Sequence, residues 1–171
     1  IDMESCGMKE IDVTKFPKLK FLDLSGNQLT NIDLSKNTLL RKLDLDNNQL
    51  DACAINDILF TLQKAQKEDE ASLQIKGNTG SSTCDNTLLE GKNWTTNVDG
   101  NGTGCNTVRL RFEDSPQGSF KTLVDGKDIP EWTPIEKGKE VKIETSPIKG
   151  YKLVKIMLNG EDVTANTFKI Q

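Results

Sequence analysis

Carboxylates and cysteines are the side chains of this sequence whose type and spacing could support chemistry. Asp2, Asp23 and Asp44 follow one another at an interval of 21 residues. A column of carboxylates could attract a cationic partner, and paired carboxylates carry out glycoside hydrolysis. The sequence contains no histidine, which argues against Ser-His-Asp hydrolysis, most general acid–base catalysis and typical zinc sites. We therefore expect a protein that is not an enzyme and that needs no metal or cofactor.

An internal repeat of 21 residues must position these side chains. Three copies of the pattern L-x-L-x-x-N/C-x-L are visible, the first of them beginning at Ile1. Each L-x-L predicts a very short strand whose two leucines point inward, and stacked copies bury a core that one copy could not bury alone. The two clearest copies share their spacing at Leu22, Leu24, Asn27 and Leu29 and at Leu43, Leu45, Asn48 and Leu50.

The period changes after Leu50 and then returns. Apolar residues at helical spacing predict a helix over about residues 54–66, with Asp51 as its N-cap. Leu73, Ile75 and Asn78 then repeat the strand pattern, which gives a fourth coil. Residues 94–98 are expected to form a closing strand, with Trp94 covering the open end of the stack.

The asparagines of the repeat are expected to form a buried ladder. Asn27, Asn48 and Asn78 each stand where the chain leaves a strand. A buried amide there can satisfy backbone N–H and C=O groups of its own coil and of the next one, and each unpaired group would cost roughly 1–3 kcal/mol. Cys6 occupies the same slot in the first copy and is expected to be a buried thiol.

A disulfide is predicted between Cys53 and Cys84. Both cysteines follow the asparagine turn of their own coil. Adjacent coils stack at roughly 4.8 Å, which suits the roughly 4.4–6.8 Å between the Cα atoms of a disulfide. Reduced thiols remain the alternative at these two positions. The four cysteines include no Cys-x-x-Cys pair, so a thiolate metal site is not expected, and the partner of Cys105 is left open.

The outward positions of the strands form the candidate site. The middle residue of each L-x-L points away from the core, so the aspartates at this position share one concave face. This face has two interpretations, a binding site for a basic partner or a solvated surface on which aspartate is merely a soluble residue. Like charges on neighbouring strands are mildly destabilising, which slightly favours a role. The candidate binding residues are Asp2, Phe21, Asp23, Lys42, Asp44 and Asp46.

The first 98 residues resemble a known class of surface protein. The run LKFLDLSGNQLTNIDLSKN resembles the leucine-rich repeats of internalin-like proteins. The stretch from Leu50 through INDILF, LQIKGNTG and Asn93-Trp94 is similar to the C-terminal cap of Bacteroides-type secreted leucine-rich-repeat proteins. The resemblance implies a right-handed solenoid of about four coils and a bacterial, exported module that binds other proteins.

A second domain is predicted after a Gly-rich linker over residues 99–105. In residues 106–171 apolar and charged residues alternate, and X-Gly turns separate the alternating runs. This pattern predicts a small all-β, β-sandwich-like domain of five or six strands. The series GKEVKIETSPIKGYKLVKIMLNGEDVT is similar to β-repeat modules of Bacteroides-type and internalin-type surface proteins, which implies a stalk or spacer.

Charge and hydropathy restrict the partners. The net charge is -4, and no basic block interleaves with aromatic residues, so nucleic-acid binding is not expected. No apolar run approaches the roughly 20 residues that cross a bilayer. Ile1 falls inside the repeat pattern, so we expect an export signal or lipid anchor outside this sequence and a secreted or cell-surface location. We expect a monomer that binds a protein or a glycan, or else a spacer without a ligand of its own.

Overall fold

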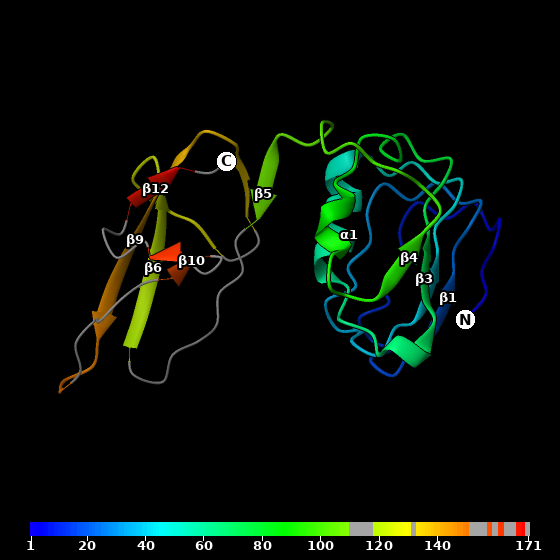
Figure 1. Ribbon diagram of the computed structural model, residues 1–171, viewed down its shortest axis with the longest axis horizontal. Helices are drawn as coiled ribbons and strands as arrows, with labels where there is room; N and C mark the ends of the chain where they lie inside the picture. Colours follow the sequence, from blue (N-terminus) through cyan, green and yellow to red (C-terminus); the bar gives the residue numbers. More distant parts are fainter. Residues whose placement is uncertain (110–117, 131–132, 151–156, 159–160, 163–166, 170–171) are drawn as a thin grey trace. The chain divides into compact units, whose positions relative to one another are not determined.

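The computed structural model describes the chain except for residues 110–117, 131–132, 151–156, 159–160, 163–166 and 170–171. The chain divides into two units, Ile1–Cys105 and Asn106–Gln171 (Figure 1). Among the described residues, no helix is both long enough and apolar enough to cross a membrane.

The first unit is built on a parallel sheet whose strand order equals the order along the chain. Its strands are β1 (Phe21–Asp23), β2 (Lys42–Asp44), β3 (Ala71–Gln74) and β4 (Trp94–Thr96). A parallel bridge between Asp2 and Asp23 extends the sheet beyond β1. Because each strand pairs with the next one along the chain, each coil stacks on the coil before it, as in a solenoid.

The leucines of the repeat form the core of the first unit. In the sheet register Leu22 lies opposite Leu43, and Leu43 lies opposite Leu73. None of these three side chains exposes more than 2% of its surface. The returning side of the coils adds Val13 and Leu34, which are also buried. The 21-residue period therefore places one inward leucine above another, and this continuous core holds the coils together.

An asparagine ladder connects the coils at the end of the strands. The Asn48 Oδ1 accepts the Leu29 N–H at 3.0 Å, and its Nδ2 donates to the carbonyls of Leu24 at 2.9 Å and Leu45 at 3.1 Å. Asn27 and Asn78 repeat this pattern in their own coils. Each amide thus serves its own coil and the preceding coil, whereas the sequence pattern predicted its own and the next.

Cys6 differs from the expectation of a buried thiol. Its side chain is exposed, with the Sγ 3.4 Å from the carbonyl oxygen of Glu4. A ladder residue is covered by the coil that precedes its own, and Cys6 belongs to the first coil of the stack. The slot is therefore buried in the later coils and open at Cys6.

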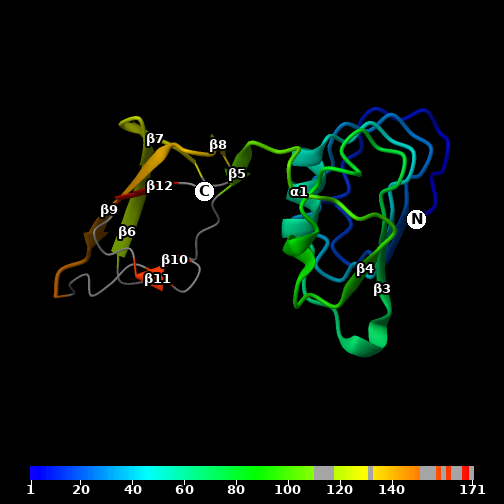
Figure 2. The ribbon, with the colours of Figure 1, turned by 45° about the horizontal axis from the view of Figure 1, so that its top comes forward.

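The helix α1 spans Ala52–Thr61 and lies on the side of the coils opposite β3 and β4 (Figure 2). Asp51 caps it by accepting the Ala54 N–H at 2.8 Å. The helix ends five residues before the predicted end at 66. The cause is tertiary pairing, because the chain beyond Thr61 bonds to the segment before β4. There the Trp94 Nε1 donates to the Gln63 carbonyl and the Ala65 N–H donates to Lys92, which outweighs further helical bonds.

The predicted Cys53–Cys84 disulfide is wrong. The bridge joins Cys53 to Cys105, whose Cα atoms are 4.8 Å apart. Cys84 is a fully buried free thiol, 3.4 Å from the Ser81 carbonyl oxygen. The prediction assumed that Cys53 and Cys84 hold equivalent slots of neighbouring coils. Cys53 instead lies in the first turn of α1, the inserted helix that breaks the repeat, while Cys84 faces the core.

The three classes of cysteine predict a distinctive labelling pattern. We expect a maleimide to modify Cys6 in the native protein, Cys84 only after denaturation, and Cys53 and Cys105 only after denaturation with a reductant. Peptide mass spectrometry after stepwise labelling would identify each site. Labelling of Cys105 together with Cys6 before reduction would contradict the Cys53–Cys105 bridge.

The Gly-rich segment 99–105 is not a linker. It folds back onto the first unit, where the Gly102 N–H donates to the Cys84 carbonyl at 2.9 Å and the Gly104 N–H to that of Thr83 at 3.0 Å. Glycine is required here because a Cβ on Gly100 would lie 2.2 Å from the Cys84 carbonyl oxygen. Cys105 is buried at the end of the segment. The first unit therefore extends seven residues beyond the predicted boundary at 98.

The described elements of the second unit are all strands. A four-stranded antiparallel sheet has the order β12 (Thr167–Lys169), β9 (Glu140–Pro147), β6 (Gly118–Val124), β7 (Lys127–Asp128). Two further antiparallel pairs join β5 (Thr107–Arg109) to β8 (Pro134–Glu136) and β10 (Met157–Leu158) to β11 (Glu161–Asp162). Ile135 and Val141 are buried together. Much of the predicted alternation, including residues 110–112 and 153–156, lies outside the described residues, so the all-β character of the whole unit stays a prediction.

Candidate binding face

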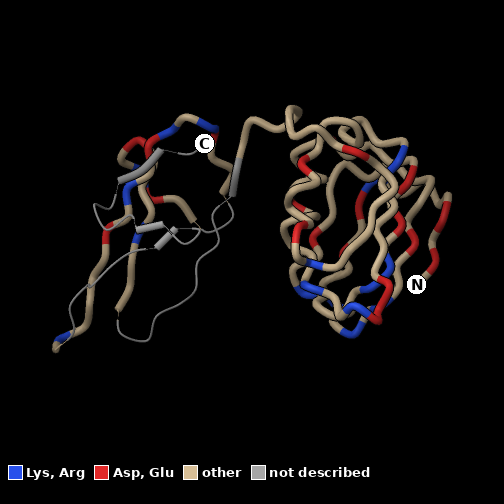
Figure 3. The backbone as a smooth tube through the Cα atoms, viewed as in Figure 1, with Lys and Arg blue, Asp and Glu red and all other residues tan. Residues whose placement is uncertain are grey.

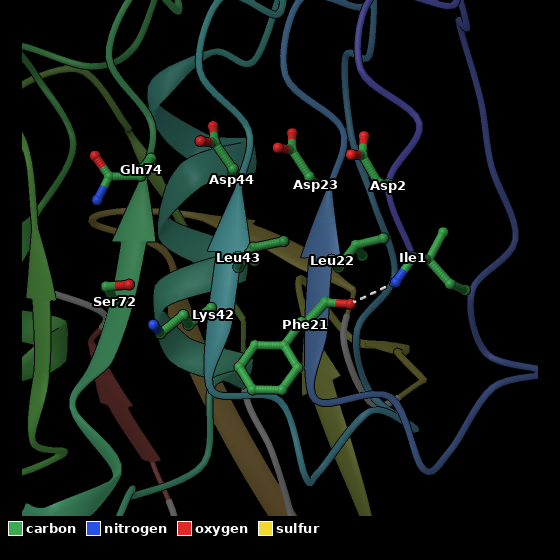
Figure 4. A pocket seen from close by; sticks show the side chains of 10 residues that line it. All are labelled: Ile1, Asp2, Phe21, Leu22, Asp23, Lys42, Leu43, Asp44, Ser72 and Gln74. Carbon is green, nitrogen blue, oxygen red and sulfur yellow. Dashed lines mark hydrogen bonds between the residues drawn. The ribbon is translucent and has the colours of Figure 1, made fainter.

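The outward side chains of the first three strands surround a shallow hollow of about 430 Å³. Outward and inward positions alternate along each strand, so the leucines that fill the core leave their neighbours on the open side of the sheet. Five of the six predicted binding residues line this hollow, all except Asp46. We call the following set the strand face: Asp2, Phe21, Asp23, Lys42, Asp44, Ser72 and Gln74 (Figure 4).

Asp2, Asp23 and Asp44 form one row at the carboxyl ends of neighbouring strands (Figure 4). The Oδ1 of Asp23 accepts the Ser25 N–H at 3.0 Å, and that of Asp44 accepts the Asp46 N–H at 2.9 Å. Aspartate commonly closes such a turn with its own side chain. One carboxylate oxygen therefore ends the strand, and the row is held in place by the backbone.

The turn that follows each carboxylate repeats as well. Ser5, Gly26, Asn47 and Gly77 all adopt positive φ, with values of 54°, 67°, 56° and 79°. Glycine and asparagine are the residues that tolerate this left-handed conformation best. The repeated turn explains why the carboxylates keep the same position from one coil to the next.

Asp46 has a structural role that its place in the repeat did not predict. Its Oδ1 accepts the Lys76 N–H at 2.6 Å, and the Asn97 Nδ2 donates to both of its oxygens, at 3.0 and 3.1 Å. Asn97 in turn accepts the Ile75 N–H. Asp46 therefore ties its own coil to the next two, and these donors compensate its charge.

The electrostatic centre of the strand face is Asp44. Partial burial raises the pKa of its carboxyl above the usual value of 3.8, and the charges of Asp46, Asp23 and Glu4 raise it further, against the hydrogen bond from Asp46, which lowers it. Figure 3 shows acidic residues on successive coils near the N-terminus. The row thus gathers negative charge that the fold itself does not neutralise.

Removing the charge of Asp44 is expected to stabilise the first unit slightly. In Asp44→Asn the new amide keeps an oxygen that can accept the Asp46 N–H, so only the charge is lost. A raised carboxyl pKa in the folded state means that ionisation opposes folding above that pKa. We expect Asp44→Asn to gain about 0.3–0.5 kcal/mol at pH 7, and the gain to vanish as the pH falls towards 3.8.

Urea unfolding of Asp44→Asn and the unmodified protein at several pH values would measure this gain. Asp33→Asn is the matched control, because the Asp33 Oδ1 closes the same kind of turn with the Ser35 N–H on the returning side of the coil. A stability gain that does not depend on pH, or one shared by Asp33→Asn, would contradict crowding of charge at Asp44.

The opposite end of the strands carries different chemistry. Phe21 exposes 56% of its surface, and Lys42 lies beside it in the sheet register. The amino terminus of Ile1 donates to the Phe21 carbonyl at 3.0 Å and completes the hollow on that side. An exposed aromatic ring in a hollow is a common contact point for a partner.

Three residues that line the hollow were not among the predicted binding residues. The repeat pattern places Ile1 at an inward position, yet 48% of its surface is exposed. Ser72 and Gln74 lie opposite Lys42 and Asp44 in the sheet register, so extension of the repeat alignment to the fourth coil could have found them. Among the described residues, no group of three or more His, Cys, Asp or Glu side chains could hold a metal ion.

Comparison with known proteins identifies one segment of the chain. Residues 17–58 match the protein family described as Leucine Rich repeats (2 copies). No curated protein and no solved structure matches the chain. The matched segment contains β1, β2 and the beginning of α1.

Proposed function

We propose that the leucine-rich repeats of residues 17–58 make this chain a non-enzymatic interaction module whose strand face binds another protein. Leucine-rich-repeat domains generally mediate protein–protein interaction. The observation that carries the proposal is the hollow of about 430 Å³ between a fixed row of carboxylates and an exposed aromatic ring. A rigid scaffold that holds side chains in place loses little entropy on binding, which favours recognition.

We further propose that the module works outside the cell, as a secreted or cell-surface adhesion protein. The Cys53–Cys105 disulfide supports this location, because such bridges persist in oxidising compartments and are rare in the cytosol. Protease treatment of intact producing cells tests the proposal: loss of the intact chain while a cytosolic enzyme survives is the expected result. Protection of the chain until the cells are lysed would contradict it.

A peptide library displayed on phage tests binding without knowledge of the natural partner. The immobilised protein is used to select peptides, and each selected peptide is then measured against variants. We expect peptides that bind the unmodified protein and lose at least tenfold in affinity, about 1.4 kcal/mol, to Asp23→Lys/Asp44→Lys. A glycan array run with the same variant extends the test to carbohydrate partners.

The control carries the same change of charge elsewhere. In Asp12→Lys/Asp33→Lys two aspartates that close turns on the returning side of the coils are replaced. Binding should survive this change. If every selected peptide and glycan binds Asp23→Lys/Asp44→Lys as tightly as the unmodified protein, the strand face is not the site.

A spacer without a ligand of its own is the second candidate function. The small size of the hollow favours it, because a standard interface buries about 800 Å² on each partner. A spacer predicts that no ligand protects the strand face. If the library and the array return no binder dependent on the strand face, the spacer function takes the place of the interaction module.

A further inference from the structure

We propose that the strand face binds an extended segment of a partner protein in which a basic residue and an acidic residue are separated by one residue. This proposal rests on the proposed function and specifies its partner. The segment lies along the strands, with its basic side chain at Asp23 and Asp44 and its acidic side chain at Lys42.

The strand face is bipolar along the strand direction. On β2 the two outward residues are Lys42 and Asp44, and on β1 they are Phe21 and Asp23. Figure 4 shows the carboxylates at one end of the strands, and Phe21 and Lys42 at the other. Two residues of a β-strand span about 6.6 Å, so this distance separates the anionic row from the cationic end.

The same distance separates alternate residues of an extended ligand. Side chains at i and i+2 point to one face of an extended chain, again about 6.6 Å apart. A ligand along the strands can therefore satisfy both ends of the face at once. A ligand across the strands would meet carboxylates at roughly 4.8 Å intervals, which its own side-chain spacing does not match.

The charges of the strand face are confined to the first two strands and the bridged Asp2. On β3 the equivalent positions are the neutral Ser72 and Gln74, and the charge of Asp46 is compensated by the Lys76 N–H and by Asn97. The uncompensated carboxylates are therefore those of the row that ends at Asp44. Partial burial and the neighbouring charges raise the Asp44 pKa, and a bound cation would relieve both effects.

Phe21 gives the basic residue a second contact. Its ring is exposed beside the carboxylates, and an aliphatic stem with a cationic head can lie over such a ring while the head reaches the acidic row. Arginine suits this geometry better than lysine, because its planar fork can bond two carboxylates together.

Titration of the full chain, labelled with nitrogen-15, by a blocked pentapeptide tests the proposal in solution. The probe is acetyl-Ser-Arg-Ser-Glu-Ser-amide, and its first comparison is acetyl-Ser-Arg-Glu-Ser-Ser-amide, in which the two charges point to opposite faces of the extended chain. A third peptide carries neutral citrulline in place of arginine. We expect the amide signals of β1 and β2 to shift with the first peptide, and the two comparison peptides to bind about three- to fivefold more weakly.

Two single variants locate the two charges of the ligand. Lys42→Gln should reduce the preference for the acidic residue, and Asp44→Asn that for the basic residue, each by about three- to fivefold. The controls Lys36→Gln and Asp33→Asn change exposed charges on the returning side and should leave the affinity unchanged. Equal binding of the three peptides, or equal effects of all four variants, overturns the proposal.

The outcomes separate this inference from the proposed function. If the phage library yields peptides that need the strand face but lack the basic-x-acidic pattern, the interaction module stands and this inference falls. If no ligand needs the strand face, both fall. Shifts of β1 and β2 signals on simple dilution would mean that a second copy of the chain occupies the face, which also overturns the proposal.

Discussion

Replacement of Asn48 by alanine is expected to lower the free energy of unfolding of the first unit by about 2–4 kcal/mol. The substitution leaves the buried Leu29 N–H without its acceptor and removes the donor to the carbonyls of Leu24 and Leu45. A buried N–H without a partner costs about 1–3 kcal/mol, and the space left by the amide adds to this cost. The two carbonyls also accept from Asn27 and Asn78, so their loss is smaller.

Urea unfolding followed by the fluorescence of Trp94 measures this loss, in a background with Trp132→Phe so that only the first unit reports. Gln49→Ala is the matched control, because Gln49 is the exposed neighbour of Asn48 and its loss should cost less than about 0.5 kcal/mol. Asn48→Asp keeps the shape but points a carboxylate oxygen at two carbonyls. Its penalty should exceed that of alanine near neutral pH and shrink in acid, where a protonated carboxyl can donate.

Equal stability of Asn48→Ala and Gln49→Ala would contradict the ladder. A large loss for alanine with none for Asn48→Asp near neutral pH would show that the amide Nδ2 is not the group that matters. In either case the coils would be held together by their leucine core alone.

The repeat explains why the sequence predicts the first unit so well. Leu22, Leu43 and the asparagines of the ladder keep a strict interval, and burial of a shared core allows one arrangement of such residues. The face of each strand follows from alternation, so the sequence alone assigns Phe21 and Asp23 to the open side of the sheet.

Features that break the repeat could not be predicted in this way. The helix α1 removes Cys53 from the register of the coils, so the spacing argument paired it with Cys84 instead of Cys105. The role of Asp46 depends on Asn97, which is 51 residues away in sequence. Such contacts are set by how the returning segments pack, and no local pattern records them.

Removal of the Cys53–Cys105 disulfide is the other change with a large expected effect. The bridged residues are 52 apart, and the chain-entropy relation gives about 4 kcal/mol for a loop of this size. The bridge also holds the segment 99–105 against α1. We expect Cys53→Ala/Cys105→Ala to lose about 3–4 kcal/mol in urea unfolding followed by Trp94, with the Trp132→Phe background as before.

Reductant provides the internal control for this prediction. It should destabilise the unmodified protein and Cys6→Ser by about the same amount as the double substitution, because both retain the bridge and Cys6 is an exposed free thiol. It should leave Cys53→Ala/Cys105→Ala unchanged, since the free Cys84 has no bridge to lose. A reductant that destabilises the double variant as strongly as the unmodified protein would mean that the stabilising bridge involves Cys84. The segment 99–105 would then be held by its backbone hydrogen bonds alone.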